Sequence, residues 1–125
     1  MKKFLGLSKK NFLEVLNNKN IKETLGWIDE FSQNGGNFKT LIEETLNELR
    51  ILLLKNNGLQ VEEAPEVKLD QKEIVILIKL LTEAYQNLKI TPIESLPLEI
   101  VVIEFFRLQK VVLLFVYYRQ IISRL

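Results

Sequence analysis

The sequence contains neither cysteine nor histidine among its 125 residues. Without cysteine, the chain has no disulfide, no thiol nucleophile and no cysteine-ligated zinc or iron–sulfur site. Without histidine, it lacks the commonest general base and the commonest zinc ligand, and a Ser-His-Asp triad is excluded. These absences favour a binding or assembly protein over an enzyme, and we expect no cofactor and no bound metal.

Long hydrophobic runs are also lacking. The uncharged apolar run at residues 111–118 is far shorter than the about 20 residues that a membrane-spanning helix needs. The opening residues 1–7 resemble the start of a signal peptide, but Ser8, Lys9 and Lys10 interrupt the apolar stretch. We therefore expect a cytoplasmic protein with no membrane partner.

The net charge of +1 hides a strong segregation of charge along the chain. Residues 1–22 carry +5, residues 23–104 carry −8, and residues 105–125 carry +4 with no acidic residue. The basic ends either bind nucleic acid, an anionic membrane or an acidic partner, or they form solvated surface near the acidic middle. The second interpretation is favoured because no arginine-rich or aromatic-interleaved motif accompanies the lysines.

Helix start and stop signals predict an all-α fold, a single bundle of about five helices. With 47% hydrophobic residues, the chain has enough apolar side chains for one packed core. Asp70 with Glu73 is the clearest capping box, and Gly35-Gly36 and Asn57-Gly58 are stop signals. The predicted helices begin at Ser8, Asn20, Asn37, Asp70 and residues 95–97.

The pattern of the last helix changes after Lys110. Residues 111–118 are apolar on all sides, so either the helix is buried all round there, or it breaks and a short strand forms. We divide the chain into a lead-in at 1–7, a helical domain at 8–110 and an apolar extension at 111–125.

Two clusters of residues are candidates for a metal or phosphate site. Glu43, Glu44 and Glu48 offer carboxylates to a magnesium ion, but a solvated acidic helix face is the stronger interpretation. The amides after Gly35-Gly36 offer a phosphate site at a helix start, but an ordinary turn between helices is the stronger interpretation.

Aromatic residues are the candidates for a partner interface. Trp27, near Phe31, is either a partner anchor or a core residue. The last helix carries more aromatic side chains than one stripe can bury in a small bundle, which favours a partner surface there. Those residues are Phe105, Phe106, Phe115, Tyr117 and Tyr118.

Three segments, in this order, resemble domain III of the bacterial DNA polymerase III gamma/tau subunit, the collar domain of the sliding-clamp loader. The first is Leu5-Gly6-Leu7. The second is Gly35-Gly36-Asn37-Phe38, leading to the helix segment Leu49-Arg50-Ile51-Leu52-Leu53-Leu54-Lys55. The third is Leu88-Lys89 followed by Pro97-Leu98-Glu99. The resemblance covers about residues 4–108 and leaves out the stretch after Lys110.

The resemblance implies an all-helical module that packs beside neighbouring subunits and holds together the ATPase domains that load the sliding clamp. It implies other clamp-loader subunits as partners, with no small-molecule substrate, no direct nucleic-acid contact and no ATP hydrolysis by this chain. In the family the ATPase module precedes the collar, so we expect either a fragment or a free-standing collar-like protein. The alternatives are the collar domain of the delta subunit, and a helical protein that binds a membrane or nucleic acid.

Two family positions give a more specific hypothesis. Glu99 falls at the Leu-Glu position and Arg50 at the Leu-Arg position of the pattern. We expect Glu99 to lie at a helix or subunit junction and to pair with Arg50 or Arg107. The simpler alternative is that Glu99 only complements the dipole of its own helix.

Overall fold

A computed structural model describes residues 10–61 and 63–124, with the backbone alone for 111–113. These residues form an all-helical bundle with no β-strand, which confirms the predicted fold class. The helices are α2 (Phe12–Asn17), α3 (Ile21–Gln33), α4 (Phe38–Asn56), α5 (Gln71–Asn87) and α6 (Leu96–Arg124).

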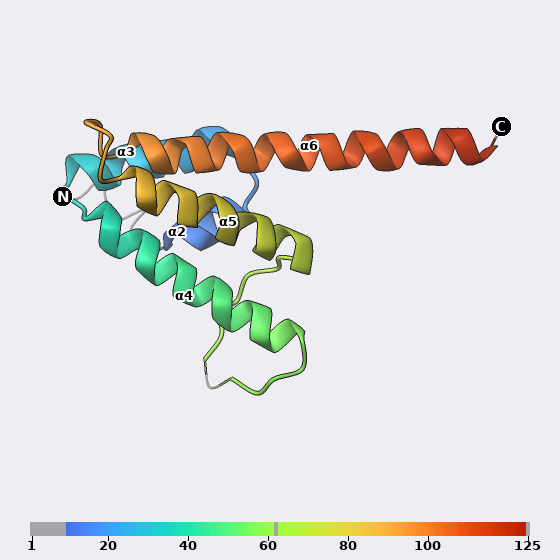
Figure 1. Ribbon diagram of the computed structural model, residues 1–125, viewed down its shortest axis with the longest axis horizontal. Coiled ribbons are helices and arrows are strands. Elements are labelled where there is room, and N and C mark those ends of the chain that lie inside the picture. The colour runs from blue at the N-terminus through green and yellow to red at the C-terminus, as the bar shows by residue number, and fades with distance from the viewer. Residues whose placement is uncertain (1–9, 62, 125) are drawn as a thin grey trace.

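The helices pack in a chain of neighbours around one core. Helix α4 packs on α5, α5 on α6, α6 on α3, and α3 on α2. Figure 1 shows α6 running along one side of the bundle and projecting far beyond it. The largest fully buried side chains come from all five helices, including Leu13, Ile28, Leu49, Leu77 and Phe105. One core therefore holds the five helices together.

Side-chain caps fix most of the helix starts where the sequence places them. Asn20 accepts a hydrogen bond from the Glu23 amide, and Asn37 accepts one from the Thr40 amide. At the start of α5 both halves of the Asp70–Glu73 capping box are formed, at 2.8 and 3.0 Å. Each cap satisfies an amide that has no partner within the helix, so it holds the chain at that residue.

The predicted start of the first helix is wrong. Helix α2 begins at Phe12, and Asn11 caps it through a reciprocal pair of hydrogen bonds with Glu14. Asparagine is as good a cap as serine, and here its partner Glu14 stands at the spacing that completes the box. Ser8, the cap that the sequence favours, lies outside the described residues.

Four aromatic rings join α2, α3 and the start of α4. Trp27 lies against Phe12 with 5.7 Å between ring centroids, and it stacks on Phe31 at 5.3 Å with only 10° between the planes. Phe31 meets Phe38 edge to face at 5.1 Å. The turn between α3 and α4 passes over this row of rings, where a Cβ added at Gly36 would overlap the Phe31 ring.

Helix α6 does not break after Lys110. It continues without interruption to Arg124, so the alternative of a break and a short strand is wrong. Nor is this part of the helix buried all round, because residues 114–124 are all exposed. The predicted boundary at residues 110 and 111 falls inside a continuous helix. About four turns of α6, from Leu96 to Gln109, already pack on the bundle. They carry the helix into solvent, since a formed helix adds residues with no new nucleation cost.

Replacing Gly36 with alanine tests the fit of the turn over the aromatic row. We expect Gly36→Ala to displace the Phe31 ring and to lower the free energy of unfolding by about 1–3 kcal/mol, the usual cost of overpacking. Urea denaturation measures the change. Gly26→Ala is the matched control, because its added Cβ meets nothing within 4 Å and alanine favours a helix interior. An equal loss in both variants would contradict this view of Gly36.

Candidate functional site

Two of the residues proposed for a partner interface belong to the core instead. Trp27 is 4% exposed, and its indole N–H donates a 3.0 Å hydrogen bond to the Lys10 carbonyl. Phe105 is 1% exposed, on the face of α6 that packs on the bundle. Neither side chain can anchor a partner while the bundle is folded, so these two assignments are wrong.

Other proposed interface residues lie at the edge of the core or on the surface. Phe31 is half-buried in the aromatic row, and Phe106 is half-buried beside Phe105, with 5.9 Å between ring centroids. Arg50 is exposed on α4, where it lines a shallow hollow with Ile51 and Leu54. These three residues keep part of their surface available to a neighbour.

The pairing expected for Glu99 with Arg50 or Arg107 is not formed within the described chain. Arg107 instead pairs with Glu104, three residues earlier on the same helix, at 2.8 Å. Glu99 is half-buried in the first turn of α6. A carboxylate there complements the positive end of the helix dipole, which is the simpler alternative given for this residue.

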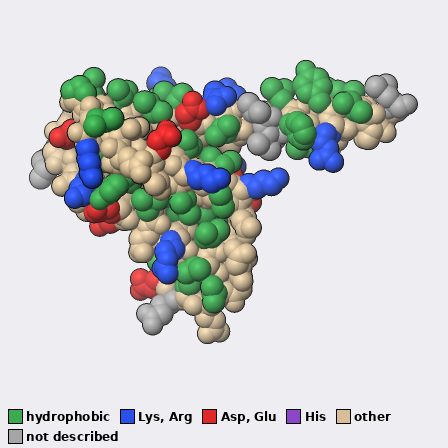
Figure 2. Space-filling model, in the orientation of Figure 1, with side chains coloured by type: hydrophobic (Ala, Val, Ile, Leu, Met, Phe, Trp, Pro, Cys, Tyr) green, Lys and Arg blue, Asp and Glu red, His purple; other side chains and the backbone are tan. Residues whose placement is uncertain are grey.

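The projecting part of α6 is the most unusual surface of the molecule. Tyr117 and Tyr118 are each 59% exposed and lie edge to face with 6.0 Å between centroids. Other exposed large apolar side chains lie on the same side of the helix, namely Leu114, Phe115, Ile121 and Ile122, whereas Val116 lies on the opposite side. Figure 2 shows hydrophobic side chains over much of the projecting end. A contiguous apolar surface of this kind is typical of an interaction site.

The part of α6 that packs on the bundle also carries exposed apolar residues. Leu96, Ile100 and Ile103 are 37–49% exposed, on the side of the helix opposite Val101 and Phe105. Sequence analysis did not single out these three residues, because it considered the aromatic side chains of this helix alone. Their spacing of four and then three residues was the available signal, since it places them on one line along a helix.

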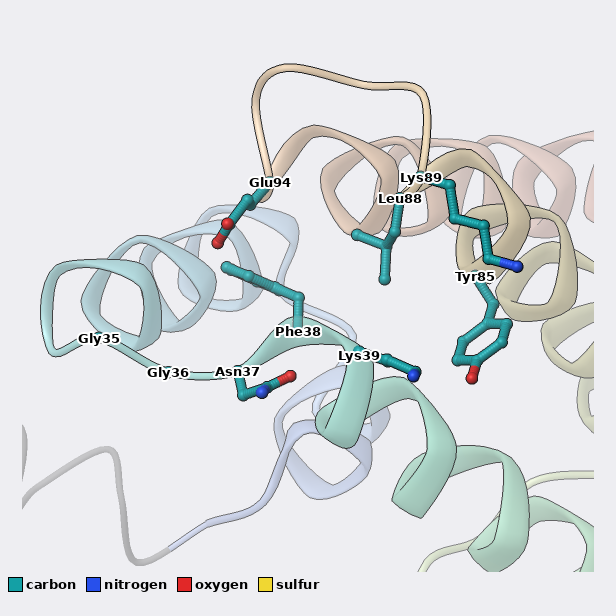
Figure 3. A pocket seen from close by; sticks show the side chains of 9 residues that line it. All are labelled: Gly35, Gly36, Asn37, Phe38, Lys39, Tyr85, Leu88, Lys89 and Glu94. Carbon is teal, nitrogen blue, oxygen red and sulfur yellow. The ribbon is translucent and has the colours of Figure 1, made fainter.

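A hollow lies between the α3–α4 turn and the α5–α6 turn (Figure 3). It is lined by Gly36, Asn37, Lys39, Tyr85 and Glu94, among others. The Asn37 side chain already accepts the Thr40 amide, and Tyr85 donates a 2.6 Å hydrogen bond to Glu43 across to α4. That bond raises the pKa of the Tyr85 hydroxyl above its ordinary value. Exposed charges of both signs line the hollow, which lies where the two turns meet.

The glutamates of α4 form an acidic surface beside α2. Glu43, Glu44 and Glu48 line a shallow groove with Asn11, whose side-chain amide donates a 2.9 Å hydrogen bond to Glu48. Burial raises the pKa of the Glu48 carboxyl, and the negative charges of Glu14 and Glu44 raise it further. Within residues 10–61 and 63–124, no group of three or more acidic side chains is arranged to hold a metal ion.

Comparison with known proteins adds no identification: no protein-family profile, no curated protein and no solved structure matches this chain. Among the described residues, none of the helices combines the length and apolar character needed to cross a membrane. The exposed apolar side of α6 is therefore the candidate functional site that the geometry itself singles out.

Neutralising Glu48 tests the electrostatics of the acidic surface. Its raised pKa means that the folded chain holds the Glu48 proton more tightly than the unfolded chain, so stability falls as pH rises through that range. We expect Glu48→Gln to stabilise the fold at pH 7 by a few tenths of a kcal/mol, because solvent screens this half-exposed group. The gain should vanish below about pH 4, where glutamate is neutral in both states.

Thermal unfolding at several pH values measures this difference, with Glu83→Gln on α5 as the control for loss of an exposed charge. A gain for Glu48→Gln that stays the same at pH 3.5 and pH 7 would contradict the electrostatic origin.

Proposed function

We propose that this chain is an assembly module of the collar type, similar to domain III of the gamma/tau subunit of the bacterial DNA polymerase III clamp loader. In this role it holds loader subunits together while other domains hydrolyse ATP and open the sliding clamp. Its own contribution is a packing surface, with no catalytic residue and no cofactor.

The exposed apolar side of α6 is the observation that carries the proposal. The exposed residues Leu96, Ile100 and Ile103 lie on the part of α6 that packs on the bundle. Tyr117 and Tyr118 lie on the projecting part. Exposed apolar surface costs about 25 cal/mol per Å² relative to a buried state, so a helix of this kind gains stability when another subunit covers it. An assembly module needs such a surface, whereas an isolated enzyme domain does not.

The second and third of the segments that carry the resemblance support the same proposal through their positions in the fold. Gly36 and Asn37 form the turn that starts α4, and the family helix segment lies in the second half of α4, where Leu49 and Leu52 are buried. Leu98, in the third segment, is fully buried in the first turn of α6. These two segments thus lie where one helix packs on the next, and the first segment, Leu5-Gly6-Leu7, lies outside the described residues.

A second candidate function is attachment to an anionic surface, a membrane or a nucleic acid. The last 20 residues of α6 favour it, because they carry four basic residues and no acidic residue. Binding of that type weakens steeply as salt screens the charges, whereas an apolar subunit contact persists. The collar of the delta subunit is an alternative assignment within the same loader.

Mixing the chain with the ATPase-bearing subunits of a bacterial clamp loader tests the proposal. We expect a complex whose mass, measured by light scattering after gel filtration, includes this chain. The complex should persist in 0.5 M salt, where the Debye length is well below the about 10 Å of 0.1 M salt and charge attraction is screened. Ile100→Lys should weaken the complex, because it places a charge on the outer side of α6. Val116→Lys is the matched control on the other side of that helix.

A chain that recruits none of these subunits would overturn the collar assignment. Binding to DNA or anionic vesicles that disappears in 0.5 M salt would support the second candidate instead.

A further inference from the structure

The apolar side of α6 changes between the bundle and the projecting part. Residues 18 apart lie on the same side of a helix, because 18 residues make five full turns. Val101 and Phe105 face the core, but the residues 18 positions later on the same side are Arg119 and Ser123. The projecting part of α6 therefore does not continue the face that packs on this chain's own bundle.

The side of α6 that faces away from the bundle is apolar at both ends of the helix and basic in the middle. Leu96 and Ile103 on the bundle correspond, 18 residues later, to Leu114 and Ile121. We call this side the outer stripe; its members alternate at spacings of four and three residues. They are Leu96, Ile100, Ile103, Arg107, Lys110, Leu114, Tyr117 and Ile121. An average spacing of 3.5 residues is the pattern of a seam between two supercoiled helices.

We propose that the outer stripe pairs with the outer stripe of a second copy of this chain, with the two α6 helices antiparallel. A two-fold axis between residues 108 and 109 sets residue 96 opposite residue 121 of the second copy. The same axis sets 100 opposite 117, 103 opposite 114, and 107 opposite 110. Three of these four layers are then apolar on both sides, and each occurs twice in a symmetric interface.

The distribution of charge along α6 favours the antiparallel arrangement over a parallel one. The acidic residues Glu99 and Glu104 lie in the first third of the helix, whereas residues 105–124 carry only basic charge. A parallel pair would bring the two basic ends together. In the antiparallel pair, the basic end of each helix lies beside the acid-bearing start of the other.

The central layer is polar and fixes the register. It brings Arg107 of one copy near Lys110 of the other, and Glu104 already neutralises Arg107 within each copy. Long basic side chains place their charged ends outside an apolar seam while their methylene groups remain in it. A polar centre of this kind lowers stability but selects one alignment of the helices.

The size of the outer stripe suits a dimer of two chains. From Leu96 to Ile121 it extends about 38 Å, at about 1.5 Å per residue. Its six apolar members are 37–59% exposed, which corresponds to on the order of 500 Å² of side-chain surface per copy. Phe115 and Tyr118 flank the stripe and bring the area toward the about 800 Å² per partner of a standard interface. Figure 1 shows α4 and α5 together on one side of α6, and the apolar members of the outer stripe remain exposed. The proposed pairing does not depend on the clamp-loader assignment.

A charge-swap experiment on the full chain tests the proposal. We expect the unmodified chain to sediment as a dimer at micromolar concentration. Leu114→Lys alone and Ile103→Glu alone should each raise the dissociation constant at least about 30-fold, the effect of losing an interface hot spot. The double variant should recover the dimer, because the antiparallel register sets residue 103 of each copy against residue 114 of the other. In a parallel pair the double variant would be weaker than either single variant.

Val116→Lys is the matched control, because Val116 is 47% exposed, close to the 49% of Ile103, but lies off the outer stripe. It should leave the dimer intact, and circular dichroism should show the same helix content in all four variants. The proposal is overturned if the chain remains monomeric at a concentration about 100-fold above the micromolar range in which a dimer is expected. It is also overturned if Val116→Lys weakens the dimer as much as the stripe variants do, or if the monomeric chain binds anionic phospholipid vesicles through α6.

Discussion

The fold is governed by a mismatch of helix lengths. Helix α6 has 29 residues and extends about 44 Å, whereas α5 and α3, against which it packs, extend about 26 and 20 Å. Gln109 donates a hydrogen bond to Glu73 at the start of α5. From Leu114 onward every described side chain of α6 is exposed, so the apolar side chains there have no cover within the described chain and are available for contact with another molecule.

Much of the bundle could be predicted from sequence because its signals are local. Asn37, Asp70 and Glu73 act on amides three residues away, so their spacing alone determines where α4 and α5 begin. Asn11 and Ser8 illustrate the limit of such signals. Both are good caps at plausible positions, and their local spacing does not distinguish them. Phe12, the first residue of α2, packs on Trp27, a tertiary contact that local spacing does not predict.

The candidate site was harder to predict because exposure is a property of the whole fold. Tyr117 and Tyr118 were recognised from their density in the last helix, and they are exposed. Phe105 was placed with them, although it lies in the core, because aromatic content does not reveal which side of a helix meets the bundle. Periodicity does reveal it: Phe105 continues the line of Leu98 and Val101, whereas Tyr117 follows the opposite side.

Trp27 also has a consequence for how this chain can be observed. It is the single tryptophan, and it is buried between Phe12 and Phe31. The projecting part of α6 carries two of the three tyrosines and no tryptophan. Indole emission therefore reports on the interior of the bundle, while the two adjacent phenol rings report on the solvent around the far end of α6. The chain thus carries separate intrinsic optical probes for its packed half and for the half that extends into solution.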